Sequence, residues 1–338
     1  MFDIISKVMN LQLFADATVI DSNVVSPINV TGQTSMSPTM KTFYDTTLLE
    51  NAREAMIFTQ FGKKQPMKGN KVEWRKFNTF AKALTPLTEG VIPTGQTFGM
   101  TNVEGTITQH GDFTAVSDRL ELESYDDVIF GATEEMGAAE GETYDTLTRN
   151  VLIAGNSVRY CPNGDTEVTS RANITNKCVL TPDVVNKAAT WLKKNKAPKI
   201  DGWYVALIHP SVAFDLRNST EWKEFHKYGA VEPIFKGDIG DLHGVRFIET
   251  NEAKVWKAGA SGASVYATLF LGKDAFGVLD PEGEGMEMIV KTKGQIGGPL
   301  EQFSTIGYKF CHGAKILYQE RLLRVESGSS LGDDDSEN

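Results

Sequence analysis

The 338-residue chain is 41% hydrophobic, which is enough to bury a sizeable core in one large domain or in two smaller ones. Its formal net charge of −10 excludes the globally basic surface that is typical of nucleic-acid-binding proteins. The three cysteines, Cys161, Cys178 and Cys311, lack the C-x-x-C spacing of zinc sites, and their sparseness favours a reducing compartment. No apolar run approaches the ~18 residues that a membrane span requires.

The first forty residues predict an arm without a core of its own. Residues 1–15 carry apolar side chains interrupted by Asp3 and Lys7, with no basic segment before them, so an amphipathic arm is favoured over a secretory signal. Residues 15–40 are rich in Ser, Thr, Asn, Val and Pro and have no helical period, which predicts an extended segment that is ordered only by partners. A helix is expected over residues 41–61, with Gly62 placed to end it.

Residues 63–120 predict a long two-stranded hairpin. Residues 71–77 alternate as a strand does, with Val72, Trp74 and Phe77 at its apolar positions, and residues 102–116 alternate again. The segment between them carries several prolines and glycines, which predicts a broad, irregular tip. Because a two-stranded ribbon is only marginally stable alone in water, it needs a surface to lie on.

Residues 121–155 predict the longest helix of the chain. The segment contains no proline, and its apolar or small residues recur at steps of three and four: Tyr125, Ile129, Ala132, Met136, Ala139, Thr143, Leu147 and Val151. A helix of roughly 28 residues would be about 42 Å long. Gly131, Gly137 and Gly141 each cost it about 1 kcal/mol relative to alanine, so it needs packing on both sides. We interpret it as a spine across which other elements lie, from this chain or from other copies.

The remaining sequence predicts a mixed α/β layer followed by a tail. Helices are expected over residues 181–195 and 211–217, and strands over residues 203–208, 245–249, 265–271 and 286–291, with residues 308–316 and 318–325 closing the sheet. Residues 156–180 are expected to form a loop or small hairpin. The last residues, 328–338, are small and acidic and are expected to be a solvated tail.

Known catalytic and cofactor patterns are missing from the sequence. The string from Gly259 to Gly262 has the wrong spacing for a nucleophile elbow, and the glycines of residues 237–244 lead into a strand instead of a helix, unlike a phosphate-binding loop. The five histidines form neither H-x-x-x-H nor H-E-x-x-H. We therefore expect no enzymatic activity, no metal and no cofactor.

Two charged clusters have an ordinary explanation. The acids Glu134, Glu135, Glu140 and Glu142 are more typical of a solvated helix face, or of pairing across an interface, than of metal or acid–base chemistry. The lysine-rich run at residues 193–196 could contact phosphate, but it is explained better as favourable placement of cations at a helix C-terminus.

Several stretches of the chain carry a resemblance to a known family. They are NLQLFA (10–15), MKTFYD (40–45), FGKKQP (61–66), FNTFAKALTPLTEG (77–90), IHP (208–210) with DLR (215–217), and GDIG (237–240) with GVRF (244–247). Together with the order of arm, hairpin, spine helix and α/β layer, these stretches resemble the major capsid proteins of tailed phages with the Hong Kong 97 fold, in particular the phage N-four type. The resemblance covers roughly residues 40–325.

The resemblance implies an α+β fold of the Hong Kong 97 capsid type, with an N-terminal arm, an extended hairpin loop, a long spine helix and a central mixed α/β domain. It divides the chain into residues 1–61 (arm and first helix), 62–120 (extended hairpin loop), 121–180 (spine helix and peripheral domain), 181–295 (axial domain), 296–326 (closing strands of the peripheral domain) and 327–338 (acidic tail).

The resemblance also implies a function. The chain would be a major capsid protein that assembles as pentamers and hexamers into the icosahedral head shell around the double-stranded DNA of a tailed bacteriophage. It would enclose the DNA without sequence-specific binding, need no cofactor or membrane, and work with scaffold, portal and decoration proteins. Assembly in the cytoplasm of the bacterial host would place it in the virion. The alternatives are an encapsulin-like compartment shell of the same fold and, in a different class, a monomeric α/β hydrolase or binding protein.

Charge patterning predicts a contact between subunits. Residues 62–82 carry seven basic residues opposed only by Glu73, and residues 118–145 carry ten acids opposed only by Arg119. We expect the hairpin of one subunit to lie across the spine helix of the next, although two independently solvated faces would explain the same pattern. The candidate contact residues are Lys71, Trp74, Arg75, Lys76, Phe77, Glu134, Glu135 and Glu142. Trp74 and Phe77 are expected to bury little area within their own chain.

Overall fold

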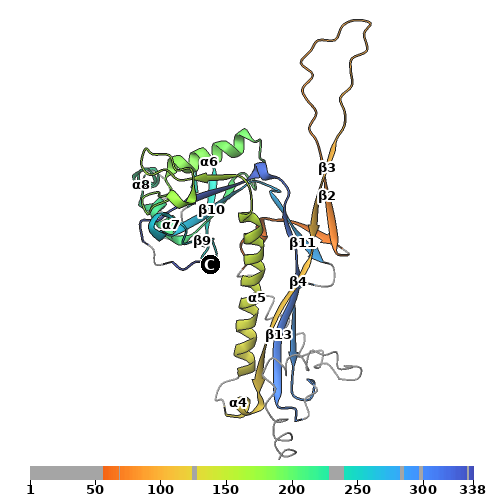
Figure 1. The fold of residues 1–338 in the computed structure, drawn as a ribbon, viewed down its shortest axis with the longest axis vertical. Helices are drawn as coiled ribbons and strands as arrows, with labels where there is room; N and C mark the ends of the chain where they lie inside the picture. The colour runs from red at the N-terminus through yellow and green to blue at the C-terminus, as the bar shows by residue number, and fades with distance from the viewer. Residues whose placement is uncertain are drawn as a thin grey trace, which may run out of the picture. The chain divides into compact units, whose positions relative to one another are not determined.

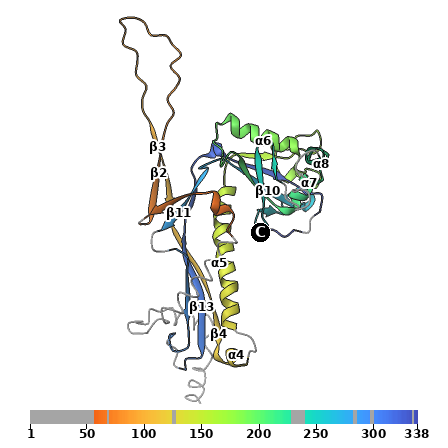
Figure 2. The ribbon, with the colours of Figure 1, turned by 180° about the vertical axis from the view of Figure 1, so that it is seen from behind.

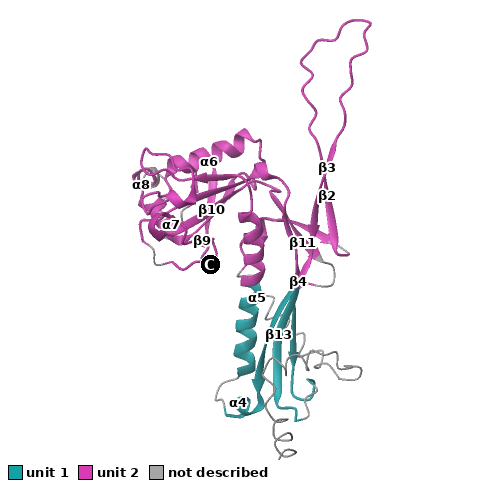
Figure 3. Ribbon diagram, in the orientation of Figure 1, with its two compact units in different colours: residues 1–54, 110–141, 286–310 teal, residues 55–109, 142–285, 311–338 magenta. Residues whose placement is uncertain are grey.

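A computed structural model describes residues 56–67, 69–123, 128–227, 240–281, 285–296, 300–332 and 335–338 (Figure 1). The expected N-terminal arm and most of the helix expected over residues 41–61 lie outside these described residues. The chain divides into two compact units, which Figure 3 shows in different colours. Unit 1 comprises residues 1–54, 110–141 and 286–310, and unit 2 comprises residues 55–109, 142–285 and 311–338.

The described helices and 3₁₀ turns are η2 (Phe58–Phe61), α4 (Asp118–Glu123), α5 (Val128–Ile153), η3 (Arg171–Asn173), α6 (Pro182–Lys194), α7 (Pro210–Asn218), α8 (Thr220–Lys227), η4 (Ala260–Gly262) and η5 (Gln319–Arg321). The described strands are β1 (Lys63–Met67), β2 (Lys71–Phe77), β3 (Met100–Thr106), β4 (Thr108–Ser117), β5 (Val158–Tyr160), β6 (Tyr204–Ile208), β7 (Asp241–Leu242), β8 (Val245–Glu249), β9 (Val255–Trp256), β10 (Val265–Leu271), β11 (Phe276–Pro281), β12 (Glu287–Lys291), β13 (Phe303–His312), β14 (Ala314–Ile316) and β15 (Leu322–Ser327). The long helix and the apolar strands predicted from the sequence are present.

Unit 2 is built on a seven-stranded sheet in the order β5-β15-β10-β6-β8-β7, with β9 paired to β10. The central strands β6 and β10 are buried at every position, which explains their continuous apolar sequence. Successive side chains of β6 point to opposite faces of the sheet. Ala206 and Ile208 pack in one core cluster with α6 and α7. Val205 and Leu207 pack in another with Leu152, near the C-terminal end of α5. Both faces of the sheet are therefore covered.

Unit 2 also contains the hairpin and a smaller sheet. β2 and β3 pair antiparallel, with Lys71 opposite Thr106 and Phe77 opposite Met100. β1 pairs parallel with β11, which pairs antiparallel with β14. The loop between β2 and β3 extends beyond the paired strands, as both Figure 1 and Figure 2 show. The hairpin with a broad tip is thus present as predicted for residues 71–106.

Unit 1 contains the three-stranded sheet β12-β13-β4. Its buried core consists of Val116 from β4, Met288 from β12 and Ile306 from β13, and Ile129 and Met136 of α5 pack against it. The two side chains on α5 are seven positions apart, two helical turns, so they share one face of the helix. The apolar face predicted for this helix is therefore its core-facing side within unit 1.

Strand pairing differs from the prediction in three places. The strand expected over residues 286–291 of the large sheet is β12, which pairs with β13 in unit 1. The single strand expected over residues 102–116 is divided into β3 and β4, and β4 pairs with β13 instead of with β2. A Cβ atom at Gly111 of β4 would lie 2.6 Å from the carbonyl oxygen of Tyr308, so the glycine allows the two strands to approach. The expectation that residues 308–316 help to close the large sheet is also wrong, because β13 belongs to the sheet of unit 1 and β14 pairs with β11. Alternation along a strand predicts its two faces but not its partner.

The C-terminal residues are docked, which corrects the expectation of a solvated tail. The amide of Ser330 donates a hydrogen bond to Asp215 Oδ2 at 3.0 Å. Asp335 Oδ2 accepts hydrogen bonds from the hydroxyl groups of Ser211 at 2.6 Å and Tyr266 at 2.5 Å. Composition alone could not predict this docking, because the acceptors and donors come from α7 and β10, far away in the sequence.

The charge of the Asp335 carboxylate contributes to docking of the tail. Burial by itself raises the pKa of Asp335, but hydrogen bonds from Ser211 and Tyr266 and the nearby His209 and Lys257 outweigh it, and the pKa is lowered. A carboxyl group with a lowered folded-state pKa stabilises the fold above its ordinary pKa of about 3.9 and loses that contribution as the pH falls. The tail should therefore stay docked at neutral pH and loosen in acid.

We expect Asp335→Asn to loosen the tail at neutral pH, because it removes the charge that strengthens both hydrogen bonds. The amides of Ser330 and Leu331 should lose roughly fivefold to tenfold of their hydrogen-exchange protection, equivalent to about 1 kcal/mol for a partly exposed charged hydrogen bond. Glu337→Gln removes the same charge from the same tail, at a carboxylate without a hydrogen bond to the described residues, and should leave protection unchanged. Equal protection in the wild type and Asp335→Asn would contradict this role.

Candidate interaction surface

The two faces of strand β2 have different surroundings. Lys71, Arg75 and Phe77 are exposed, whereas Trp74 and Lys76 are partly buried. The period of two along a strand puts the first three on one face and the last two on the other. Of the five candidate contact residues on the hairpin, three are therefore available to a partner and two face their own chain.

Trp74 packs within unit 2, so the expectation that it buries little area in its own chain is wrong. A Cβ atom at Gly105 would lie 2.6 Å from the Trp74 ring, and one at Gly277 would lie 2.9 Å from it. Both glycines therefore make room for the indole. The indole N–H is buried without a hydrogen-bond partner among the described residues.

Lys76 also has partners in its own chain. Its ammonium group lies 3.7 Å from the carboxylate of Glu320 and 4.4 Å from the centre of the Tyr318 ring. Lys71 and Arg75 have no ion pair with any residue that the structure describes. Lys71 and Arg75 are therefore free cations on the exposed face of strand β2.

The loop that joins β2 to β3 exposes many apolar side chains. Every residue from 78 to 98 is exposed, and only Lys82 and Glu89 among residues 78–99 are charged. The large exposed apolar residues from the end of β2 to the start of β3 are Phe77, Phe80, Leu84, Leu87, Val91, Ile92, Phe98 and Met100. The Phe98 ring stacks on Phe77 at 4.9 Å and on Phe80 at 5.5 Å, which groups the aromatic residues at the base of the loop. Large exposed apolar side chains gathered along one loop indicate a binding site.

The acids of helix α5 do not form one exposed cluster. Glu134, Glu135 and Glu142 are exposed as predicted, but Glu140 is fully buried. Neither carboxylate oxygen of Glu140 has a hydrogen-bond partner among the described residues, and burial raises its pKa to about 8. Glu134, Glu135 and Glu142, which are the acids among the candidate contact residues, are therefore accessible.

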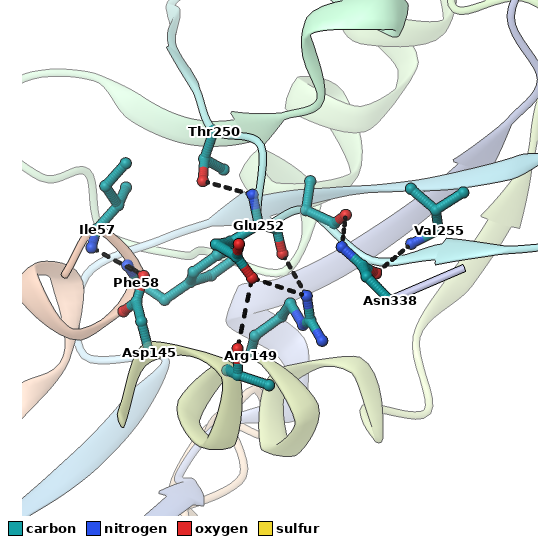
Figure 4. Close-up of polar contacts among 10 residues, drawn as sticks. Ile57, Phe58, Asp145, Arg149, Thr250, Glu252, Val255 and Asn338 are labelled. Atoms are coloured by element: carbon teal, nitrogen blue, oxygen red, sulfur yellow. Dashed lines mark hydrogen bonds and ion pairs between the residues drawn. The ribbon is translucent and has the colours of Figure 1, made fainter. Parts of the chain in front are cut away.

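Asp145 is also buried, so it cannot belong to the acidic face expected to meet a neighbour. It accepts hydrogen bonds from the backbone amides of Ile57 at 2.9 Å and Phe58 at 3.2 Å (Figure 4). It also accepts one from the amide of Thr59 at 3.1 Å. Burial raises its pKa, although these hydrogen bonds act in the opposite direction. The carboxylate holds the segment just before β1, and so fixes the base from which the hairpin starts.

A second set of contacts in Figure 4 ties both α5 and the C-terminal residue to residues 252–255 of the α/β layer. Arg149 donates to the carbonyl of Glu252 at 2.7 Å and lies 3.5 Å from its carboxylate. Asn338 accepts from the amide of Val255 at 2.9 Å and donates to the carbonyl of Ala253 at 3.1 Å. These polar contacts are structural, and none of them places a nucleophile beside a base.

The described part of the chain holds neither a metal-binding cluster nor a membrane-spanning helix. No group of three or more histidine, cysteine, aspartate or glutamate side chains is placed to hold a metal ion there. Cys161, Cys178 and Cys311 are buried, and no disulfide bond joins them. None of the described helices is long and apolar enough to cross a membrane. The exposed hairpin is therefore the strongest candidate for a functional surface.

The chain matches one protein family and resembles several solved structures. The model of a family described as phage capsid protein matches residues 94–290. No curated protein sequence matches the chain. Similar solved structures include the capsid of cyanophage P-SCSP1u (15% identity, TM-score 0.62, covering 81% of this chain and 89% of that chain) and the capsid of Ralstonia phage GP4 (16%, 0.60, 82% and 89%). Another is the capsid of cyanophage Pam1 (14%, 0.65, 84% and 93%). At such identities the structural likeness shows the fold alone.

Proposed function

The chain belongs to the family of phage capsid proteins, and we propose that its copies assemble as pentamers and hexamers into an icosahedral shell around the double-stranded DNA of a tailed bacteriophage. It is a major capsid protein, a structural component of the phage head, and its place is the virion. Its likeness to solved phage capsids confirms the α+β fold of the Hong Kong 97 type.

The match of the phage capsid family model to residues 94–290 carries this proposal. The exposed apolar loop between β2 and β3 supports it, because such a surface needs cover and a neighbouring subunit would supply it. Further parts of the proposal are the absence of catalysis, assembly in the bacterial cytoplasm, and cooperation with scaffold, portal and decoration proteins. The division into arm, hairpin loop, spine, peripheral and axial domains and tail, with the boundaries predicted from the sequence, is proposed on the same basis.

Assembly tests the proposed function directly. The purified chain should form capsomers or closed icosahedral particles, visible by electron microscopy and by sedimentation. A stable monomer at high protein concentration, with and without the other head proteins, would contradict it. The alternative of a compartment shell is separated by the contents, because particles from infected cells should contain double-stranded DNA and not protein cargo.

We propose that the hairpin of one subunit lies across the acidic residues of helix α5 of the next. Lys71 and Arg75 are exposed and lack ion pairs to described residues, and they are matched by the exposed acids Glu134, Glu135 and Glu142. Exposed pairs contribute only ~0.2–1 kcal/mol each, but a closed shell repeats them in every subunit. Lys76 is left out of the proposal, because it is partly buried and lies over the Tyr318 ring of its own chain.

We expect Lys71→Glu with Arg75→Glu to reduce the yield of particles at least about tenfold, because attractions at each contact become repulsions. Reversing the helix acids in the same chain should restore part of the yield: Glu134→Lys, Glu135→Lys and Glu142→Lys. The defect of the hairpin variant should weaken in high salt, since the Debye length falls from about 10 Å at 0.1 M to about 3 Å at 1 M. Particle yield is measured by sedimentation.

The matched control for this experiment is the pair Lys177→Glu and Lys315→Glu, called the control pair below. Both lysines are exposed and have no ion pair with a described residue, and neither lies on the hairpin strands. The control pair makes the same change in net charge and should assemble normally. Normal assembly of the hairpin variant, or no rescue by the reversed acids, would show that the two charge runs are not partners.

A further inference from the structure

Two adjoining hollows lie beside helix α6 in unit 2. The larger, of about 280 Å³, lies between α6 and strand β5, and the smaller, of about 180 Å³, continues along α6. They share Arg159 of β5 and Lys187 of α6, so they form one trough. The other residues that line the trough and matter here are Asn186, Thr190, Trp191 and Lys194 in the smaller hollow.

The trough is basic although the whole chain carries a net charge of −10. Arg159 and Lys194 are exposed and have no ion pair with any described residue. Lys187 pairs with Asp183 at 2.7 Å, but both side chains are well exposed, so the pair is weak and can exchange. Glu167, in the larger hollow, is the one acid among the residues that line the trough.

The dipole of helix α6 does not explain why these cations lie together in the trough. The C-terminal end of a helix favours cations, which accounts for Lys194 in the last turn of α6. That effect does not reach Lys187 in the middle of the helix or Arg159 on a different element. Three cations from two elements therefore converge on the trough without a described structural partner for two of them.

The chemistry of the trough fits a phosphate backbone. Arginine, lysine, asparagine and threonine side chains supply most protein contacts to phosphate oxygens, and these contacts position nucleic acid without reading its sequence. Arg159, Lys187 and Lys194 supply the charges, and Asn186 and Thr190 supply neutral donors between them. More exposed lysines, at positions 193, 196 and 199, extend the positive charge past the end of the helix.

We propose that this trough binds the phosphate backbone of double-stranded DNA without sequence specificity. The inference rests on the proposed function in one respect, namely that the shell encloses such DNA. It goes beyond that function because it assigns the DNA contact to α6 and β5, in a chain whose net charge is negative. The trough would hold the DNA by local charge, while counterions neutralise most of the genome.

The test measures binding of a labelled 20-base-pair DNA of random sequence to the full-length chain by fluorescence anisotropy, between 50 and 200 mM salt. We expect Arg159→Glu with Lys194→Glu to weaken binding at least about tenfold. The slope of log K against log salt should decrease in magnitude by about 1.8, since each lost phosphate contact removes about 0.9. The control pair, Lys177→Glu and Lys315→Glu, changes the net charge equally and should bind DNA like the wild type.

Three results would overturn the proposal. Unchanged DNA binding by the trough variant, or an equal loss in the control pair, would overturn the proposal. If the trough variant lost binding to polyglutamate but still bound DNA, the trough would be a site for an acidic protein. That result would also overturn the proposal. Sedimentation of the same samples separates the two proposals: a trough variant that assembles but loses DNA supports the site, whereas a wild type that binds DNA but never assembles contradicts only the head shell.

Discussion

Glu326→Ala is expected to lower the free energy of unfolding by about 3–5 kcal/mol, because it removes a buried carboxylate and leaves two partly buried guanidinium groups without their counter-charge. Glu326 is fully buried in β15. Its carboxylate accepts two hydrogen bonds from Arg171, both at 2.7 Å. The Arg324 Nε lies 2.9 Å from the same carboxylate, an ion pair that lacks hydrogen-bond geometry. The Arg171 guanidinium stacks 3.6 Å above the Trp256 ring, so the position of this cation is fixed from two sides.

The measurement is urea unfolding followed by circular dichroism, with two further variants. Glu326→Gln keeps the volume and one acceptor oxygen but removes the charge, so its loss should be smaller than that of Glu326→Ala. Glu320→Ala removes an exposed carboxylate from the same unit, 3.7 Å from Lys76, and should change stability by no more than about 0.5 kcal/mol. A loss below about 1 kcal/mol for Glu326→Ala would mean that solvent replaces the carboxylate.

The charged group of Glu326, Arg171 and Arg324 also shows what the sequence can and cannot predict. The continuous apolar runs of β6 and β10 and the period of α5 are local patterns, and they predicted these elements correctly. Glu326 gave no signal, because its partner Arg171 lies 155 positions away in the chain. A charged residue in a strand looks the same in sequence whether it faces water or a buried guanidinium.

The candidate surface was predictable to a similar extent. Alternation along residues 71–77 placed Val72 and Trp74 on one face of β2 correctly, but Phe77, grouped with them as apolar, lies on the opposite, exposed face. Trp74 faces two glycines, Gly105 and Gly277, whose small size matters only once the fold brings them together. In the same way, the burial of Asp145 depends on amides of residues 57–59, nearly ninety positions earlier. Composition predicted the charge of these segments, and tertiary structure decided which charges remain available.

Replacing Leu84, Leu87 and Ile92 together by serine should prevent particle formation while leaving the stability of the chain unchanged. The three side chains are 84%, 77% and 92% exposed, so their loss removes almost no packing within the subunit, and the free energy of unfolding should change by no more than about 0.5 kcal/mol. If a neighbouring subunit buries them, each contributes about 1.5–3 kcal/mol to the contact, and every contact in the shell loses all three. Thr85→Ser with Thr88→Ser changes the same loop at polar positions and should assemble normally. Particles that form at the wild-type yield from the serine variant, as measured by sedimentation and electron microscopy, would show that the loop does not bind a neighbour. A lower unfolding midpoint of the serine variant would instead show that these side chains pack in the core of their own subunit.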